Sequence, residues 1–319
     1  MVIEPPLRVA FFGTPDFAVP TLDALLASRH QVVAVVTQPD RPRGRGQKVV
    51  LSPVKARAAE SGVPVLQPTK LRHAAFVEAF TALQADLGVV AAYGRILPAA
   101  LIETPRLGMI NVHASLLPRY RGAAPIHRAV IAGETVTGVT IMRVVEALDA
   151  GPMMAVKDRA IGPDETSQDI ERSLAGIGAG LLVEVADQLA AGLSRETPQD
   201  ERLATYANRI TREDGLINWS LAAKSVHDLV RGLVPWPHAF TFLDGTRLIV
   251  IQSRALGSGG SHPEPGTVVK ASGDELVVAA GDSFIQLLRL QPEGRRVLTA
   301  REFLAGHVVR PGSRFGSRS

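Results

Sequence analysis

Asn111 and His113 lie two residues apart at the end of an apolar segment, GMINVH, residues 108–113. In a β-strand the side chains alternate between the two faces of the sheet, so this amide and this imidazole would share one face. Acyl transfer to an amine needs a donor for the developing oxyanion and a group that handles the proton lost by the amine. Asn111 and His113 are the residue types that supply these two functions.

Asp149 is the candidate for a third function, a carboxylate that holds the histidine in place. It lies in VEALDAGPM, shortly after the predicted strand Val139–Val144. Turns that follow parallel strands gather at one edge of the sheet, and we therefore expect Asp149 to meet His113. The residues alone leave a simpler interpretation open. A histidine at a strand end is more often just hydrogen-bonded, and an aspartate before Ala-Gly is commonly a turn former.

The elements that would position these residues alternate between apolar strand-like segments and amphipathic helix-like segments. The strand-like segments are residues 7–13, 31–37, 63–66, 87–94, 108–113 and 138–144, and the helix-like ones are 22–28, 53–61, 73–83, 125–131 and 167–191. This alternation predicts an α/β fold with a doubly wound, mostly parallel sheet. The first strand-to-helix turn has Gly13 as its only glycine, which disfavours a dinucleotide-binding function.

The pattern changes after Pro198. A polar connector leads to one predicted helix, residues 220–232, and then to short strands, residues 239–256, 266–271, 275–280 and 283–290, with Asp-Gly, Ser-Gly and Gly-Asp turns between them. Short strands separated by such turns predict a small β-barrel. We therefore expect a catalytic domain over residues 1–190, a linker over 191–208 and a second domain over 209–319.

The composition narrows the class of protein. The chain has 319 residues and no cysteine, which excludes a disulfide scaffold, a thiolate metal site and a cysteine nucleophile. It has no ligand cluster such as H-E-x-x-H, so we expect no metal. No apolar run approaches the roughly 20 residues of a membrane span, and a strand-like segment begins almost at once. We expect a cytoplasmic protein without a signal peptide or a membrane anchor.

A basic loop, PDRPRGRGQK, follows the second predicted strand and holds the cations Arg41, Arg43, Arg45 and Lys48. Its prolines and glycines predict that no helix or strand forms, which suits a mobile arm for phosphates and base edges. A solvated charged loop is an equally open interpretation. Residues 201–319 hold 15 basic and 11 acidic residues and thus the whole net charge of +4. This balance fits a polyanionic partner for the C-terminal part, but it fits an ordinary soluble surface equally well.

Several further segments, in this order and at these spacings, resemble the methionyl-tRNA formyltransferases over nearly the whole chain. They are FFGTPDFAVPTLDAL, VVTQPDRPRGRGQK, SPVK, VVAAYGRILP, INVHASLLPRYRGAAPI, TGVTIM, LDAGPMM, INWS, PWPHAF, PGT and RPG. The resemblance implies a Rossmann-like formyltransferase domain followed by an OB-like barrel. It also implies transfer of the formyl group of 10-formyltetrahydrofolate to the α-amino group of methionine on initiator tRNA.

The resemblance also implies roles for individual residues. Asn111, His113 and Asp149 match the catalytic positions of the family. The folate co-substrate would lie along two segments, formed by Gly94, Arg95, Ile96 and Leu97 and by Ser115, Leu116, Leu117 and Pro118. The basic loop would enter the acceptor stem of the tRNA, with Arg45 at the key position, and Arg209 falls where the family carries a basic residue. The chain departs from the family at Ala114 and Ala150, where HGSLLP and LDTG are usual.

Two alternative functions remain open. A folate-dependent formyltransferase acting on a nucleotide-sugar amine or on glycinamide ribonucleotide would share the Asn, His and Asp residues but would not need the basic loop. A non-catalytic RNA-binding protein would explain the charge of the second domain but not the Asn-x-His pattern with its aspartate. No obligate protein partner is evident from the sequence.

Overall fold

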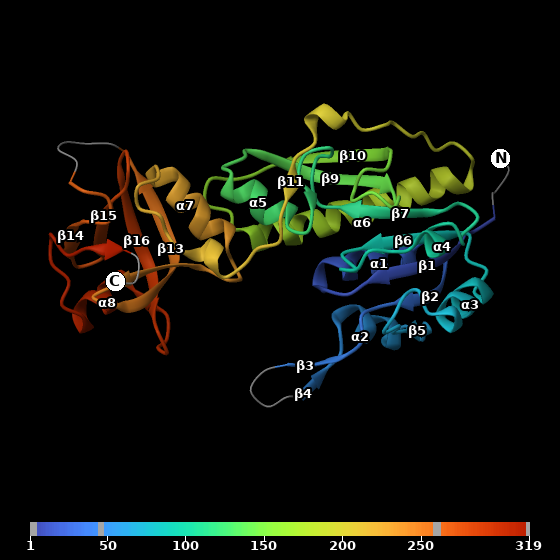
Figure 1. Cartoon of the computed structure of the whole chain (residues 1–319), viewed down its shortest axis with the longest axis horizontal. Coiled ribbons are helices and arrows are strands. Elements are labelled where there is room, and N and C mark those ends of the chain that lie inside the picture. Colours follow the sequence, from blue (N-terminus) through green and yellow to red (C-terminus); the bar gives the residue numbers. More distant parts are fainter. Residues whose placement is uncertain (1–4, 44–47, 258–262, 317–319) are drawn as a thin grey trace. The chain divides into compact units, whose positions relative to one another are not determined.

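The chain divides into two compact units (Figure 1). The computed structural model describes residues 5–43, 48–257 and 263–316, and for residues 41–43 and 48–49 it describes the backbone alone. Unit 1 comprises Met1–Pro125, Thr137–Arg159 and Glu171–Ala207, and unit 2 comprises Ile126–Val136, Ala160–Ile170 and Asn208–Ser319.

A seven-stranded sheet forms the centre of unit 1, with the strand order β10-β9-β7-β6-β1-β2-β5. In chain order its strands are β1 (Arg8–Gly13), β2 (Gln31–Val36), β5 (Val65–Leu66), β6 (Leu87–Ala91), β7 (Met109–His113), β9 (Val136–Arg143) and β10 (Met153–Ala160). The five strands from β7 to β5 are parallel neighbours. This arrangement confirms the predicted doubly wound, mostly parallel sheet.

Helices cover both faces of this sheet. The helices of unit 1 are α1 (Val19–Ala27), α2 (Pro53–Glu60), α3 (Ala74–Ala82), α4 (Ala99–Ile102) and α6 (Ser167–Ala190), and its 3-10 helices are η1 (Asp16–Ala18) and η2 (Glu201–Leu203). Phe80 of α3 and Leu101 of α4 share a buried cluster with Met109 of β7. Gly178 of α6 instead lies against Val112 of the same strand. Because Met109 and Val112 point to opposite faces, α3 and α4 cover one face and α6 covers the other.

Helix α6 is long and apolar enough to cross a membrane by composition alone, but half of its most apolar stretch is buried within the structure. Its buried residues include Leu174, Leu182 and Val185, each 0% exposed. These are the properties of a helix in a protein core, where an apolar face packs on a sheet.

Unit 2 is built around an antiparallel sheet with the order β14-β15-β16-β13-β12-β18, to which β17 adds beside β16. Its strands are β12 (Ala239–Leu243), β13 (Thr246–Leu256), β14 (Val268–Ser272), β15 (Glu275–Ala279), β16 (Phe284–Pro292), β17 (Leu298–Thr299) and β18 (Phe315–Gly316). Its helices are α5 (Pro125–Ile131), α7 (Ala223–Gly232) and α8 (Ala300–Gly306), with the 3-10 helix η3 (Glu213–Gly215). Thr267 pairs with Arg314, which joins the two end strands of the sheet. The curled sheet confirms the predicted barrel.

Two local predictions are wrong. Strand β9 runs antiparallel to β7, with His113 opposite Thr140 and Ile110 opposite Arg143. The turn after β9 therefore starts at the far end of β7, and not at the shared edge from which we expected Asp149 to reach His113. The basic loop also forms strands, since β3 (Arg41–Arg43) and β4 (Lys48–Val50) pair as an antiparallel hairpin. A two-stranded ribbon leaves outward-facing nitrogens unpaired, so it accepts Pro42.

Candidate functional site

The candidate site lies at the carboxyl ends of β1, β6 and β7. The strand order reverses between β1 and β6, because the chain proceeds from β1 to β2 on one side and returns to β6 on the other. Open parallel sheets place their ligand crevice at this reversal. The loops that follow the two strands are tied together here, since the Thr14 hydroxyl donates to the Tyr93 carbonyl oxygen at 3.3 Å.

Asn111 and His113 point to the same face of β7, as their spacing predicts. Asn111 is half-buried on a strand held between β6 and β9, and its amide makes no hydrogen bond with any described residue. His113 is 5% exposed, and its Nε2 lies 3.0 Å from the Tyr120 carbonyl oxygen. A carbonyl oxygen only accepts, so Nε2 carries a hydrogen and donates it to Tyr120, while Nδ1 lies on the other side of the ring.

Asp149 reaches His113 through the loop that follows β9. Its Oδ2 lies 3.7 Å from His113 Nδ1, which is too long for a hydrogen bond, so the ring is held by Tyr120 rather than by Asp149. Asp149 has a φ of 47°, and its Oδ2 accepts a hydrogen bond from the Gly122 amide at 2.8 Å. The Asp149 carboxylate therefore faces the His113 ring while the Gly122 amide holds it in place.

Gly122 is the residue that brings the backbone close to Asp149. It has a φ of 115°, and a Cβ there would lie 3.0 Å from the Ala207 carbonyl oxygen. Gly122 belongs to β8 (Arg121–Gly122), which pairs in parallel with β11 (Tyr206–Ala207). The segment predicted as a linker thus contributes a strand beside the candidate site. The sequence pattern missed this pairing because each strand has only two residues.

The SLLP segment follows His113 directly. Ser115 is 1% exposed, and its hydroxyl donates to the Arg119 carbonyl oxygen at 2.7 Å, so it stabilises the turn itself. The Ser115 carbonyl oxygen accepts from the Thr140 hydroxyl, and the Leu117 amide donates to the same hydroxyl oxygen. Leu117 is buried, Leu116 and Pro118 are half-buried, and the peptide between Leu117 and Pro118 is cis.

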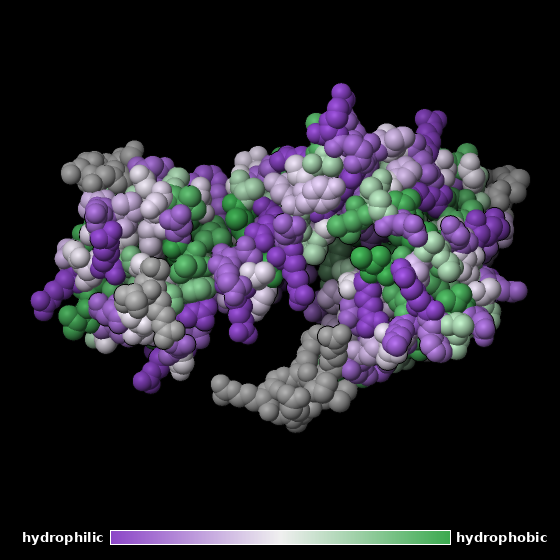
Figure 2. All heavy atoms as spheres, viewed as in Figure 1, coloured by the Kyte–Doolittle hydropathy of each residue, from purple (hydrophilic) through white to green (hydrophobic). Residues whose placement is uncertain are grey.

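The residues of the segment after β6 differ in their contacts and in their exposure to solvent. Gly94 has a φ of 78°, and a Cβ there would lie 2.7 Å from the Gln38 side chain, so only glycine fits without a shift. Arg95 donates to the carbonyl oxygens of Pro68 and Thr69, which fixes its guanidinium. Ile96 is 79% exposed whereas Leu97 is 6% exposed and belongs to the core cluster. Figure 2 shows apolar surface among hydrophilic side chains on this unit.

The structure describes only some of the basic residues that were expected to bind the tRNA. Arg45 lies outside the described residues, as do the side chains of Arg41, Arg43 and Lys48, whose backbones form the hairpin. At the base of the hairpin the Lys55 ammonium hydrogen-bonds to Asp40 and, at 2.7 Å, to Gln67, and this contact holds the pKa of Asp40 below its usual value. Arg209 is exposed in unit 2, and its carbonyl oxygen accepts from Arg128.

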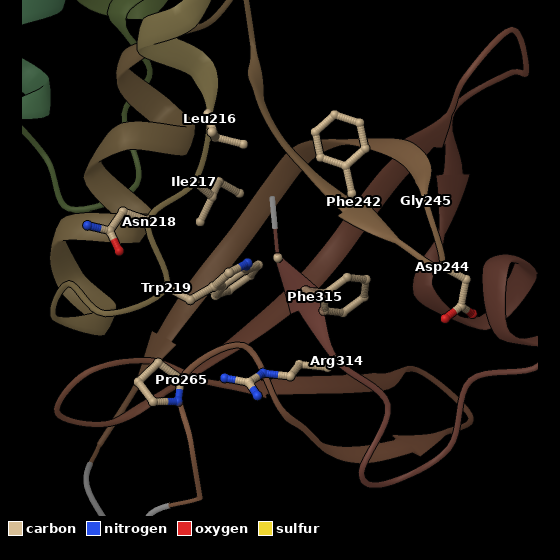
Figure 3. A pocket seen from close by; sticks show the side chains of 11 residues that line it. Leu216, Ile217, Asn218, Trp219, Phe242, Asp244, Gly245, Pro265, Arg314 and Phe315 are labelled. Atoms are coloured by element: carbon tan, nitrogen blue, oxygen red, sulfur yellow. The ribbon is translucent and has the colours of Figure 1, made fainter. Parts of the chain in front are cut away.

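Unit 2 carries a cavity of its own, of about 640 Å³ (Figure 3). Trp219 and Phe315 line it and stack on each other, with ring centroids 5.9 Å apart, and Phe242 and Asp244 lie opposite. The Trp219 indole nitrogen donates to the Thr241 hydroxyl, so this side chain is fixed by the barrel core. None of the three candidate catalytic residues lines this cavity. Within the described parts of the chain, no group of three His, Asp or Glu side chains could hold a metal ion.

The chain matches formyltransferase family models over most of its length. The family model described as formyl transferase matches residues 7–186, and the model described as formyl transferase, C-terminal domain, matches residues 209–308. The N-formyltransferase from Helicobacter canadensis, solved with folinic acid and dTDP-3-aminofucose, has a similar fold, with a TM-score of 0.68 and 17% identity over 90% of this chain and 99% of that one.

The particular family follows from the sequence relatives. Methionyl-tRNA formyltransferase from Geotalea daltonii is 47% identical over 98% of this chain and 99% of its own length. The enzyme of the same name from Geotalea uraniireducens is 46% identical over 98% of this chain and 99% of its own length. The chain belongs to the methionyl-tRNA formyltransferase family.

Proposed function

We propose that this enzyme transfers the formyl group of 10-formyltetrahydrofolate to the α-amino group of methionyl initiator tRNA. The observation that carries the proposal is the meeting of Asn111, His113 and Asp149 beside the SLLP turn, where the carboxyl ends of the parallel strands gather. The folate bound to solved relatives of the same fold supports the choice of co-substrate. We further infer that the enzyme works in the cytoplasm, binds the acceptor stem and needs no obligate protein partner.

In this mechanism the amine nitrogen attacks the formyl carbon, the formyl oxygen becomes an oxyanion, and the bond from that carbon to N10 of the folate then breaks. The unpaired Asn111 amide donates to the formyl oxygen, and His113 stabilises the oxyanion through the positive charge that its ring gains when Nδ1 shares the proton of the amine. Asp149 accepts the proton lost by the amine, and His113 Nδ1, 3.7 Å away, shares it before it passes to the departing N10. Tetrahydrofolate and the formylated amine are the products, so no proton is gained or lost overall.

The tRNA would be bound by phosphate contacts on both units. In unit 1 the strands of the basic hairpin carry Arg41, Arg43 and Lys48, and its base is fixed by Asp40, Lys55 and Gln67. In unit 2, Arg254 of β13 and Arg289 of β16 are exposed on neighbouring strands, and neither forms an ion pair with a described acidic residue. Such contacts give affinity and register rather than sequence specificity.

The proposal is tested with the purified full chain, 10-formyltetrahydrofolate and three acceptors: methionyl initiator tRNA, a dTDP-linked amino sugar and glycinamide ribonucleotide. We expect formylation of the tRNA alone. Transfer to the amino sugar or to the ribonucleotide without transfer to tRNA would replace the proposal with one of the small-molecule alternatives. Binding of the tRNA without any transfer would indicate a non-catalytic RNA-binding protein.

The folate-contacting role of the segment after β6 is tested by two neighbouring substitutions. Ile96→Ala removes an exposed side chain, so we expect a raised KM for the folate and an unchanged free energy of unfolding. Leu97→Ala removes a buried side chain from the core cluster and is expected to cost about 2–5 kcal/mol of unfolding free energy. Steady-state kinetics and urea denaturation measure the two effects. An unchanged folate KM in Ile96→Ala would remove this residue from the proposed pocket.

Arg45 and Lys48 provide a matched test of the hairpin. A guanidinium can be placed bidentate against a base edge or a phosphate, whereas an ammonium acts as a point charge. We expect Arg45→Ala to lower kcat/KM for initiator tRNA more than for an elongator tRNA or an acceptor-stem variant, with little change in the folate KM. Lys48→Ala should lower all three tRNA values alike and reduce the salt slope of binding by roughly 0.9 or less. Equal losses on all three tRNAs in Arg45→Ala would make it a non-specific phosphate contact.

A further inference from the structure

A buried arginine beside the candidate site is held entirely by the segment that was expected to act as a linker. Arg121 is 2% exposed, and its Nε and Nη2 donate to Gln199 Oε1 at 3.0 and 2.8 Å. Its Nη1 and Nη2 donate to the two carboxylate oxygens of Glu201 at 2.9 and 2.8 Å. The hydrogen bonds to the Glu201 carboxylate raise the pKa of Arg121, so the guanidinium stays charged.

Gln199 also forms hydrogen bonds with the loop that contains Asp149. Its Nε2 donates to the carbonyl oxygens of Asp149 and of Gly151, both at 2.8 Å. The amide orientation is fixed by its partners, because Arg121 can only donate and the two carbonyls can only accept. Asp149 has a positive φ of 47°, which is a costly conformation for a residue with a side chain. The two Gln199 hydrogen bonds fix the carbonyl group of this residue and that of Gly151, two residues further along the turn.

We propose that Gln199 is a positioning residue that holds the carboxylate of Asp149 against His113, with Arg121 as the group that orients it. The catalytic role of Asp149 rests on the proposed function, whereas the hydrogen bonds that hold this residue do not depend on it. Arg121 fixes Gln199, Gln199 fixes the backbone of Asp149 and Gly151, and the amide of Gly122, next to Arg121, fixes the Asp149 side chain at 2.8 Å. Backbone and side chain of Asp149 are thus both held by this one network.

The same segment continues into the chain of unit 2, since β11 ends at Ala207 and unit 2 resumes at Asn208. The β11 strand pairs with Arg121 and Gly122, the two residues that orient Gln199 and bind the Asp149 carboxylate. Gln199 and β11, both in the polar segment between the sheet and the barrel, therefore help to position Asp149. This segment does more than connect two domains.

The test uses full-length Gln199→Glu, which keeps an oxygen for Arg121 but replaces the amide donor with a second oxygen facing two carbonyls. We expect kcat to fall roughly 10- to 100-fold, as for a displaced catalytic group, with the KM values for folate and tRNA changed by less than about threefold. The matched control is Arg202→Ala, three residues further along in η2, whose side chain is 89% exposed and pairs only with Asp200 among the described residues. Its kcat should equal that of the wild type.

Hydrogen exchange of the Gly122 amide, followed by NMR, supplies a readout that does not depend on activity. We expect it to exchange faster in Gln199→Glu by roughly tenfold or more, since its acceptor Asp149 is no longer held. A kcat within about twofold of wild type, or an unchanged Gly122 amide, would overturn the positioning role, as would an equal loss in Arg202→Ala. If the wild-type enzyme formylates no tRNA, the proposed function fails, and the amide exchange alone decides the positioning role.

Discussion

His113→Ala is expected to lower kcat for formylation of methionyl-tRNA by roughly 100-fold or more, because it removes a group that acts in the transition state. The ring is 5% exposed and is fixed by the Tyr120 carbonyl oxygen, so its position does not depend on a bound substrate. Its loss also removes the nitrogen that lies 3.7 Å from Asp149 Oδ2 and that we propose shares a proton with it. Asn111→Ala and Asp149→Ala should lower kcat by similar factors, and their effects should not add to that of His113→Ala, since the three residues act as a unit.

Measuring the affinity for tRNA distinguishes a loss of catalysis from a loss of folding in these variants. The affinity for tRNA should stay close to wild type in all three variants, because the cations of the hairpin and of the barrel are unchanged. Asp149→Asn is the conservative control, since an amide can still accept from the Gly122 amide but takes no proton at neutral pH. Turnover close to wild type in His113→Ala would contradict the catalytic assignment, and normal turnover in Asp149→Asn would limit Asp149 to a structural role.

The main elements of both units could be predicted from the sequence because their signals are local. Alternation of apolar strands with amphipathic helices predicts the parallel sheet, and short strands between glycine turns predict the barrel. The direction of β9 could not be predicted, since the side chains of a strand alternate in the same way whether it runs parallel or antiparallel. Strand β10 was missed for another reason: its burial pattern includes four exposed residues of eight, as in an edge strand with little apolar signal.

The candidate site was predictable to the extent that its residues share one strand or one turn. Asn111 and His113 follow from a period of two, and the Ser115 turn follows directly after them. Asp149 was predicted to lie near His113 for a wrong reason, since it arrives through a folded-back loop and not from a common sheet edge. Gln199 gave no signal, because a glutamine in a polar segment resembles any solvated residue until its buried partner, Arg121, is placed beside it.

Removing residues 208–319, which form most of unit 2, is expected to abolish tight tRNA binding while leaving a folded catalytic unit. The position of the cut determines how stable that unit is. A fragment ending at Ala190 contains the sheet and both folate segments, and we expect it to fold and bind the folate. It lacks Gln199 and Glu201, however, and so leaves the buried Arg121 guanidinium without these acceptors. A fragment ending at Ala207 keeps both acceptors and β11. The two fragments lose the same contacts to residues 208–319, such as the hydrogen bond from Ser167 to the Gly232 carbonyl oxygen.

The fragment ending at Ala207 should therefore have the higher Tm, by roughly 5 °C or more, because it keeps the Arg121 hydrogen bonds and the pairing of β8 with β11 that the shorter fragment loses. Affinity of both fragments for initiator tRNA should fall by roughly 100-fold or more at physiological salt, since the phosphate contacts of the barrel are lost together. Thermal unfolding and filter binding measure the two effects, and folate binding confirms that the fragments are folded. Equal Tm values would show that residues 191–207 contribute nothing to unit 1. Full tRNA affinity in either fragment would assign recognition of the tRNA to the catalytic unit alone.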